Sequence, residues 1–294
     1  MKKIALISDI HSNHNAFTAV INDALSKGVE GFIFLGDYVT DFPDARETLD
    51  LLYKIKEEFP CFIIRGNRER YLLEAQRGEI ELAKGTRTGS WLYNYNRLNE
   101  SDLAYFASLP ISDELEIEGI KCEITHSGRD NDRIFFEPGD ETIEKIFAEM
   151  KTNYLFTGHS HKQYIARSNG KTIINPGSVG LPRGSACKAQ YAIIRVENQT
   201  ISAELLQIGY DIKAAIRRHF ESGFVDCARF WALSALHDAV TGVEYTARLL
   251  HYANRLTNGN ALSTDDEAIW EESANAIGLK FSEEEIISLA SKYI

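Results

Sequence analysis

The sequence predicts an α/β fold in which two mixed β-sheets pack together between flanking helices, followed by a C-terminal helical extension. Three observations predict it. Strand-like apolar runs alternate with helical segments up to Arg65, hairpin signals dominate as far as Leu206, and strand-like segments cease after Gly209. We therefore expect a core of residues 1–208 and an extension of residues 209–294 that packs on it.

The first part of the chain alternates between strands and helices. The expected elements are, in order, strand 4–7, helix 15–27, strand 32–35, helix 44–58 and strand 61–65. Asn15 has the side chain of an N-cap, and Gly28 stands where a glycine commonly ends a helix. This alternation predicts a parallel sheet joined by right-handed crossover helices.

The middle of the chain combines helices with hairpins. Helices 69–76 and 91–108 are expected to form a cap beside the functional site. Turn signals such as Glu118-Gly119 predict hairpins that pair 115–117 with 120–125, 164–167 with 172–174 and 192–196 with 201–206. Helix 142–150 and strand 154–157 lie between the first two hairpins. The hairpins favour a second sheet packed on the first.

The segment after Gly209 reads as helical throughout. Helices are expected over 211–221, 228–256, 264–276 and 282–291. In the longest of them, apolar residues recur at steps of three and four: Phe230, Leu233, Leu236, Val240, Val243, Ala247 and Leu250. Such a stripe packs either on the protein's own core, which we expect, or against a second copy in a homo-oligomer.

Composition excludes several classes of function. The 294-residue chain carries a formal charge of −11, which argues against a general nucleic-acid surface. An anionic substrate would therefore need a local positive source such as a metal ion. The four cysteines form no CxxC pair, and the apolar run before Asp9 is too short for a signal peptide or a membrane span. We expect a cytoplasmic protein that does not associate with membranes.

Candidate metal ligands follow the short apolar runs, where ligand sites gather in open α/β sheets. Each motif alone has an ordinary explanation: Asp9 and Ser12 could cap a helix, and Gly36-Asp37 or Asn67 could be turn residues. Their joint occurrence at successive strand ends favours a metal site. The candidate ligands are Asp9, His11, Asp37, Asn67, His126, His159 and His161. Imidazole, carboxylate and amide donors suit divalent Mn, Fe, Zn or Ni.

The order of these motifs resembles the calcineurin-like metallophosphoesterase superfamily. The pattern DxH, GD, GN, H and GHxH extends from Lys3 to about Leu206. The segment 175–180, Asn-Pro-Gly-Ser-Val-Gly, is similar to a signature of the branch that holds bacterial phosphodiesterases and diadenosine tetraphosphate hydrolases, as is Tyr210-Asp211. The resemblance implies a four-layer sandwich and a hydrolase with two divalent metal ions.

The resemblance also implies a role for each ligand. One metal ion would be held by Asp9, His11 and His161, and the other by Asn67, His126 and His159. Asp37 would bridge the two, together with a hydroxide that attacks phosphorus in line. The residues expected to carry the reaction are Asp37, Asn67, Arg68 and His126.

Arg68 departs from the pattern of the superfamily, in which many members have a histidine after Gly-Asn. Arginine cannot act as a general acid, although it can bind phosphate through two parallel hydrogen bonds. Either another residue protonates the leaving group, with His14 nearest in sequence, or the leaving group needs no proton. The plainer alternative is that Arg68 is a solvated residue at a helix start.

Other residues are weaker candidates for substrate binding. Arg183 is the favoured additional cation, and with Arg68 and His14 it completes the expected substrate-binding set. Three other arginines are more ordinarily surface ion-pair residues: Arg65, Arg70 and Arg129. Three aromatic residues of the expected cap could stack a base or simply be packed: Trp91, Tyr93 and Tyr95.

The leading functional hypothesis is hydrolysis of phosphodiester or phosphoanhydride bonds in small nucleotide-type substrates such as dinucleoside polyphosphates. A protein serine/threonine phosphatase is one alternative, which Arg68 disfavours because that branch has a histidine there. A non-catalytic scaffold, like the retromer subunit of this fold, is the other. A scaffold should lose ligands, whereas all seven positions here carry competent donors.

Overall fold

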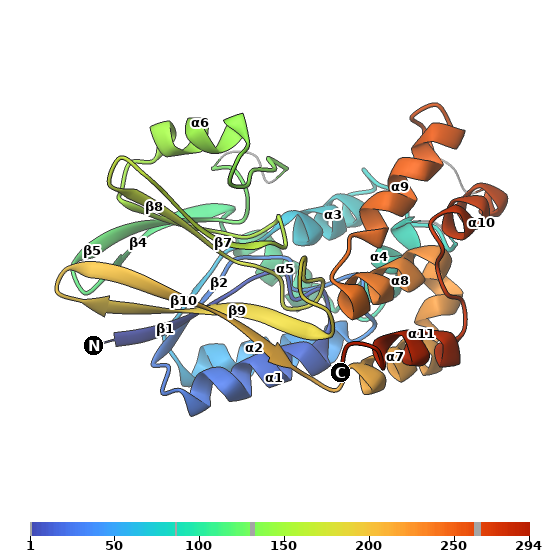
Figure 1. The fold of residues 1–294 in the computed structure, drawn as a ribbon, viewed down its shortest axis with the longest axis horizontal. Coiled ribbons are helices and arrows are strands. Elements are labelled where there is room, and N and C mark those ends of the chain that lie inside the picture. Colours follow the sequence, from blue (N-terminus) through green and yellow to red (C-terminus); the bar gives the residue numbers. More distant parts are fainter. Residues whose placement is uncertain (1, 86, 130–132, 262–265) are drawn as a thin grey trace.

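The computed structural model describes residues 2–85, 87–129, 133–261 and 266–294. Two five-stranded mixed sheets pack face to face, with helices on the outer face of each and a group of helices at one end (Figure 1). The predicted α/β class and the pair of packed sheets are confirmed.

The first sheet has the order β10-β9-β1-β2-β3. Strands β1 (Lys2–Ile7), β2 (Gly31–Phe34) and β3 (Cys61–Ile63) are parallel, with Ile4 opposite Gly31. Helices α1 (His14–Ser26) and α2 (Ala45–Glu58) provide the crossovers. On the other side of β1, β9 (Lys188–Glu197) and β10 (Thr200–Gly209) run antiparallel. The predicted alternation is confirmed, and the last predicted hairpin joins the same sheet.

The N-cap of α1 is Asn13, so the expectation of Asn15 is wrong. The Asn13 side chain accepts a hydrogen bond from the Ala16 amide at 3.2 Å. Asn15 already lies inside the first turn, where its side chain cannot reach back to the unpaired amides. The other end is as expected, because Lys27 is the C-cap and Gly28 has a left-handed φ of 73°.

The second sheet has the order β4-β5-β6-β8-β7. The hairpins β4–β5 (Ser112–Ile117 and Ile120–Thr125) and β7–β8 (Gln163–Ser168 and Lys171–Pro176) flank β6 (Tyr154–Thr157). Helix α6 (Glu141–Glu149) covers the outer face of this sheet (Figure 1). These elements match the predicted hairpins, helix and strand.

Three apolar clusters hold the four layers together. The cluster between the sheets includes Leu6, Ile33, Ile124, Phe156 and Ile194. The cluster between the first sheet and its helices includes Phe17, Val20, Phe34, Leu49 and Leu52. The cluster under α6 includes Ile143, Phe147, Leu155 and Ile173. Burial of these side chains stabilises each interface by about 25 cal/mol per Å² of apolar surface.

The cap region contains three helices, α3 (Asn67–Gln76), α4 (Arg87–Tyr95) and α5 (Glu100–Ser108), so the single helix expected over 91–108 is wrong. The chain breaks because Asn99 caps α5, accepting from the Asp102 amide at 2.9 Å. Trp91 and Tyr93 are only 4% and 6% exposed. Packing, and not base stacking, therefore accounts for these two aromatics.

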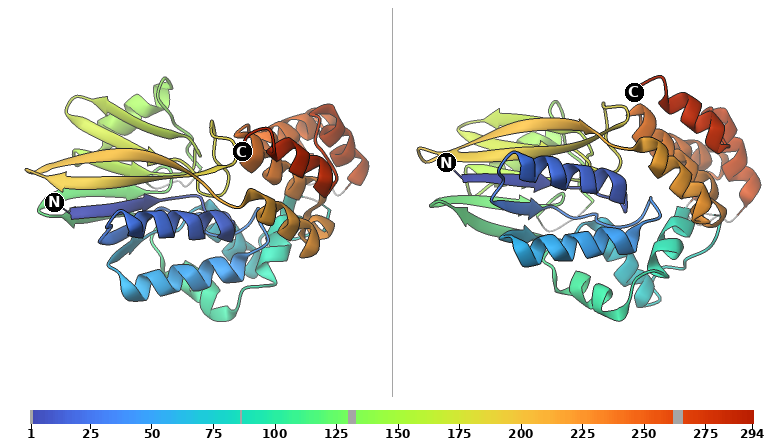
Figure 2. Two further views of the ribbon diagram at one scale, coloured as in Figure 1. Left: turned by 60° about the horizontal axis from the view of Figure 1, so that its bottom comes forward. Right: turned by 90° about the horizontal axis from the view of Figure 1, so that it is seen from below.

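The C-terminal segment forms five described helices beside the end of the sheets to which β1 and β2 point (Figures 1 and 2). They are α7 (Ile212–Glu221), α8 (Phe224–Thr241), α9 (Tyr245–Leu256), α10 (Glu267–Ala276) and α11 (Glu283–Ala290). The single helix expected over 228–256 is wrong, because Gly242 ends α8 with a φ of 70°. The expected helix 264–276 begins at residues 264–265, which lie outside the described residues.

The apolar stripe of this segment divides at the same break. Its first four residues are buried in a cluster with Phe42, Leu181 and Cys187 of the preceding part of the chain; they are Phe230, Leu233, Leu236 and Val240. The chain itself therefore covers this half of the stripe. Across the described ranges, no helix has both the length and the apolar character needed to cross a bilayer.

Candidate metal centre

The seven predicted ligands follow the ends of five strands, β1, β2, β3, β5 and β6; six lie in the loops there, and Asn67 is the first residue of α3. Five of them adopt left-handed backbone conformations, with φ between 53° and 65°: Asp9, His11, Asp37, His159 and His161. Such conformations cost about 1–3 kcal/mol each in a non-glycine residue and persist where the surroundings enforce them. Hydrogen bonds between the loops do so here, including Asp9 N to Gly36 O at 3.1 Å and His11 N to Asp37 O at 3.0 Å.

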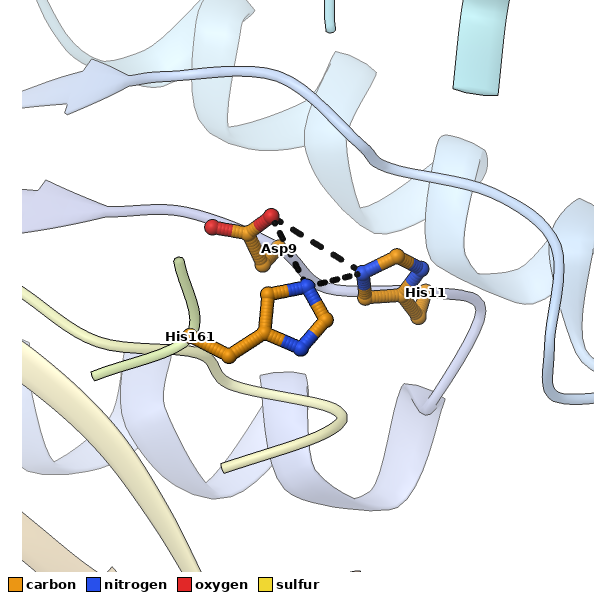
Figure 3. Close-up of side chains that lie close together, drawn as sticks. All are labelled: Asp9, His11 and His161. Carbon is orange, nitrogen blue, oxygen red and sulfur yellow. Dashed lines mark hydrogen bonds and ion pairs between the residues drawn. The ribbon is translucent and has the colours of Figure 1, made fainter. Parts of the chain in front are cut away.

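Asp9, His11 and His161 point toward one another and form the first ligand group (Figure 3). The two imidazole Nε2 atoms are 3.1 Å apart. The Asp9 Oδ1 atom lies 3.3 Å from Nε2 of His161 and 3.8 Å from Nε2 of His11. Within the described part of the chain this buried oxygen has no hydrogen-bond partner. The group therefore has the form of a cation site.

Asp9, Asp37 and His126 form the second group. The Nε2 atom of His126 lies 3.4 Å from Asp37 Oδ2 and 3.1 Å from Asn67 Oδ1. Its Nδ1 atom is 2.7 Å from the carbonyl of Leu35, an arrangement in which Nδ1 carries the proton. The lone pair on Nε2 then faces two oxygen acceptors, and a cation or a second proton is needed to relieve the repulsion.

Asp9 and Asp37 connect the two groups. Asp9 belongs to both, and Asp37 Oδ2 lies 3.9 Å from Nε2 of His11 as well as near His126. The ring of His159 packs against that of His126 at 5.1 Å between centroids. The structure thus brings all seven predicted ligands into one cluster, and this donor set fits divalent transition metals.

The charges within the cluster perturb one another strongly. Burial acts to raise the pKa of Asp37, yet His126 and His11 hold it well below its usual range. Burial acts to lower the pKa of His126, but the Asp37 carboxylate raises it to about 10. Burial and the charge on His126 lower the pKa of His159 to about 4. A metal ion would therefore displace a proton from His126 on binding.

Arg68 is buried beside this cluster and is only 9% exposed, so it is not a solvated helix-start residue. Its amide donates to Asp37 Oδ1 at 2.8 Å, and its Nη2 atom lies 3.0 Å from Asp41 Oδ2. Among the described residues, its Nε and Nη1 groups have no hydrogen-bond partner, although Nε lies 3.9 Å from Asp37 Oδ2 as an ion pair. The hydrogen-bonding capacity of both groups remains available for an anion.

Asp41 is a site residue that the sequence reasoning missed. Its carboxylate lies 3.0 Å from Nδ1 of His11 and accepts from Nε1 of Trp231 at 2.7 Å. A carboxylate in this place orients a metal-binding imidazole and raises its basicity. No motif or spacing marks Asp41, because its partners come from the loop after β1, from α3 and from α8.

Glu69 was also missed, although a signal for it exists. Its carboxylate accepts from the amides of Gly66 at 2.8 Å, Asp37 at 3.0 Å and Tyr38 at 2.7 Å. It therefore ties the Asp37 loop to the Asn67 loop. A glutamate three residues after a helix cap is the spacing of a capping box, which could have identified it.

The segment 175–180, singled out from the sequence, supports the ligand loops. Asn175 donates to the Gly158 carbonyl at 2.7 Å, and Ser178 Oγ donates to the Asp9 carbonyl at 2.8 Å. Asp211 caps α7 by accepting from the Ala214 amide at 2.9 Å. These residues position backbone and do not contact the converging ligand atoms in any hydrogen bond of the described chain.

The remaining predicted cations lie outside the ligand cluster. His14 is paired with Thr18 of its own helix, 3.3 Å away. Arg183 donates to the Ser160 carbonyl at 3.0 Å and pairs with Glu137 and Glu244. Two of the weaker candidates form ion pairs with nearby glutamates: Arg70 with Glu74 and Arg129 with Glu123.

Comparison with known proteins places this geometry in a family. Residues 1–199 match the calcineurin-like phosphoesterase superfamily domain. An uncharacterized protein of Methanocaldococcus jannaschii is 29% identical over 235 residues, covering 73% of this chain and 90% of that protein. A probable metallophosphoesterase of Methanothermobacter thermautotrophicus is 22% identical over 108 residues, 37% of this chain and 59% of its own length.

Solved structures share the fold at low sequence identity. A hypothetical protein from Pyrococcus horikoshii has a TM-score of 0.70 and 19% identity, covering 83% of this chain and all of that one. A metallophosphoesterase from Sphaerobacter thermophilus has a TM-score of 0.63 and 24% identity, covering 81% of this chain and 99% of that one. Given the domain match over most of its length, the chain belongs to the calcineurin-like phosphoesterase superfamily.

Proposed function

We propose that the protein is a hydrolase with a binuclear metal centre that cleaves phosphodiester or phosphoanhydride bonds in small nucleotide-type substrates. Dinucleoside polyphosphates are the leading substrate class, which corresponds to the diadenosine tetraphosphate hydrolase-like branch. The observation that carries the proposal is a largely buried cluster in which the potential metal-binding atoms of Asp9, His11, Asp37, Asn67, His126 and His161 converge, with the His159 ring packed against His126.

The proposed ligand assignment is the one that the family resemblance implies; its first set coincides with the first ligand group, and its second set shares His126 with the second group. Asp9, His11 and His161 would hold one ion, and Asn67, His126 and His159 the other, with Asp37 between them. Mn, Fe, Zn and Ni all accept these donors. Ions bound there would supply a nucleophile at neutral pH from acidified water and would neutralise negative charge on the phosphoryl group.

Arg68 supplies the main protein contribution to substrate binding in this proposal. Its buried Nε and Nη1 groups, which lack hydrogen-bond partners in the described chain, would hydrogen-bond phosphate oxygens and stabilise the charge that develops on them. Arginine cannot donate its proton. A leaving group that departs as a stable anion, such as a nucleoside polyphosphate, is therefore the best match.

The two alternative functions, a protein phosphatase and a non-catalytic scaffold, predict different experimental results from those of a nucleotide hydrolase. A protein phosphatase would release phosphate from phosphopeptides in preference to nucleotides. A scaffold of the same fold would bind no catalytic metal and turn over neither. The buried Arg68 groups that lack hydrogen-bond partners in the described chain, beside seven intact ligands, support the enzyme over the scaffold.

The test is Asp37→Asn, with Asp50→Asn as a control on the exposed face of α2, where the side chain is 65% exposed. Because Asp37 connects both ligand groups, we expect less bound metal by elemental analysis and turnover of bis(p-nitrophenyl) phosphate reduced by at least about 100-fold. The control should match the unmodified protein. Full metal content and normal turnover in Asp37→Asn would reject the binuclear assignment.

A further inference from the structure

Solvent reaches the ligand cluster at two partly exposed histidines, His159 and His161. The His161 side chain is 19% exposed, whereas those of Asp9, His11, Asp37 and His126 are between 0% and 2% exposed. The side of His161 is therefore one direction in which a substrate with its phosphate at the cluster can extend.

A groove of about 840 Å³ lies on this side, between the loops at residues 162 and 183–184 and the helices α9 and α10. One wall begins beside the cluster, because Lys162 directly follows His161 and the Arg183 amide donates to the His161 carbonyl at 2.9 Å. The Gly184 amide donates to the Gly242 carbonyl at 2.8 Å, which connects this wall to the helix side of the groove.

The groove carries more positive than negative charge although the whole chain carries −11. Lys162 and Arg183 share Glu137, and Arg183 also pairs with Glu244 at 3.0 Å. Arg248 lies exposed on the same groove and makes no ion pair within the described ranges. Three permanent cations thus face two carboxylates, which leaves one cation available for an anionic ligand.

The same groove offers an apolar surface beside its charges. Tyr252 and His251 provide rings on α9, and Val243, Ala247 and Ile277 contribute aliphatic surface. A ligand that combines a planar aromatic group with a phosphate would bury its ring here while its phosphate contacts Arg248. A free inorganic phosphate would use only part of this surface.

We propose that this groove binds the leaving portion of the substrate and that this portion is a nucleotide with a phosphate of its own. The proposal rests on the phosphoesterase function proposed above. Arg248 is its principal specificity residue, since it faces the groove without an ion-pair partner in the described chain. The C-terminal helices would then select the substrate class, while the core carries the metal ligands.

The experiment measures ADP and inorganic phosphate binding to full-length, metal-loaded protein by titration calorimetry. ADP represents the leaving nucleotide, whereas phosphate can occupy the metal centre alone. The variant is Arg248→Glu, and the matched control is Arg217→Glu, an exposed arginine on α7 that does not line the groove. We expect the ratio of ADP affinity to phosphate affinity to fall about tenfold in Arg248→Glu, as for loss of one charged hydrogen bond, and to stay constant in the control.

Two results would overturn the groove assignment: an unchanged ratio in Arg248→Glu, or no measurable ADP binding to the unmodified protein. An equal fall in Arg217→Glu would also reject it, since a general charge effect would then suffice. The phosphoesterase function is judged separately, by turnover of bis(p-nitrophenyl) phosphate. If the unmodified protein shows no turnover but Arg248→Glu lowers the ratio of ADP affinity to phosphate affinity, the phosphoesterase function is rejected and the nucleotide groove is retained. If turnover is normal and the ratio is unchanged, only the groove is rejected.

Discussion

Asp41 links the ligand cluster to the C-terminal helices. Its carboxylate is fully buried and contacts His11, Arg68 and the indole of Trp231. Burial acts to raise its pKa, but Arg68 and His11 hold it well below the usual range. The residue therefore stays ionised and can orient the His11 ring through Nδ1.

We predict that Trp231→Phe weakens metal binding by about tenfold, because the substitution removes the shortest of the hydrogen bonds that hold the Asp41 carboxylate, which also accepts from Ser90 and Thr40. Metal affinity can be measured by competition with a chelating dye. Trp91→Phe is the control, since the Trp91 indole is buried but its Nε1 makes no hydrogen bond in the described chain. Equal metal affinity in Trp231→Phe and Trp91→Phe would show that Asp41 needs no support from α8.

His219 gives the protein a pH-dependent stability. It is buried on α7 between the rings of Phe42 and Phe224, and burial lowers its pKa to about 3. The unfolded chain has the ordinary histidine pKa of about 6.5 and binds the proton more readily. The contribution of neutral His219 to the free energy of unfolding is therefore fully present above about pH 6.5 and is lost as the pH falls toward 3.

The corresponding prediction compares His219→Gln with the unmodified protein in urea unfolding between pH 7 and pH 5. Below pH 6.5, the free energy of unfolding should decrease more steeply for the unmodified protein than for the variant. The difference should be up to about 1.4 kcal/mol for each pH unit. Parallel slopes for the two proteins would contradict the assignment of this pH dependence to His219.

At the scale of elements, the strand ends approach one another more closely than most side chains would allow. A Cβ atom placed on Gly66 would lie 2.2 Å from Asp37 Oδ1 and 2.6 Å from the Asp37 amide. One placed on Gly158 would lie 2.0 Å from Ser8 Oγ. Glycine at these two positions lets the segments after β2 and β3, and those after β1 and β6, approach each other closely.

We predict that Gly66→Ala displaces the Asp37 carboxylate and so reduces both metal content and turnover, with a smaller effect on folding. Gly209→Ala is the matched control, because a Cβ there meets no atom within 4 Å and the glycine does not have a positive φ. Elemental analysis and circular dichroism of the two variants separate a local from a global effect. Normal metal content in Gly66→Ala would mean that the loops can separate without loss of the site.

At the scale of the whole molecule, we propose that residues 1–208 form the core and 209–294 an extension that unfolds together with it. The apolar cluster of the extension contains Phe42, Leu181 and Cys187 as well as its own helices. The Trp231–Asp41 hydrogen bond crosses the same boundary. Shared burial of this kind favours a single cooperative unfolding transition.

Leu236→Ala tests this coupling, because Leu236 is fully buried in the shared cluster. We expect a loss of about 2–5 kcal/mol of unfolding free energy in a single transition, followed both by a core tryptophan probe and by far-UV circular dichroism. Leu256 on α9 is 37% exposed, so Leu256→Ala should lower the free energy of unfolding much less. Two separate transitions, with only one shifted by Leu236→Ala, would contradict cooperative packing of the extension.

The sequence predicted the pair of packed sheets and the set of residues that gather in the ligand cluster. It could do so because apolar runs identify buried strands, and polar residues directly after parallel strands meet at one edge of a sheet. The proximity of Asp9 and Asp37 follows from that rule, because β1 and β2 are parallel neighbours in one sheet, whereas His126 follows a strand of the other sheet. Local patterns also located most helices and hairpins.

The tertiary structure decided what depends on contacts between distant residues. Trp231 lies 190 positions from the Asp41 that it supports, and Arg248 faces a groove whose other wall begins at Lys162. The break at Gly242 was likewise missed, since an apolar stripe continues across it in sequence. The periodicity of apolar residues indicates which face of a helix or strand is buried. Which other element covers that face is determined only when the elements pack together.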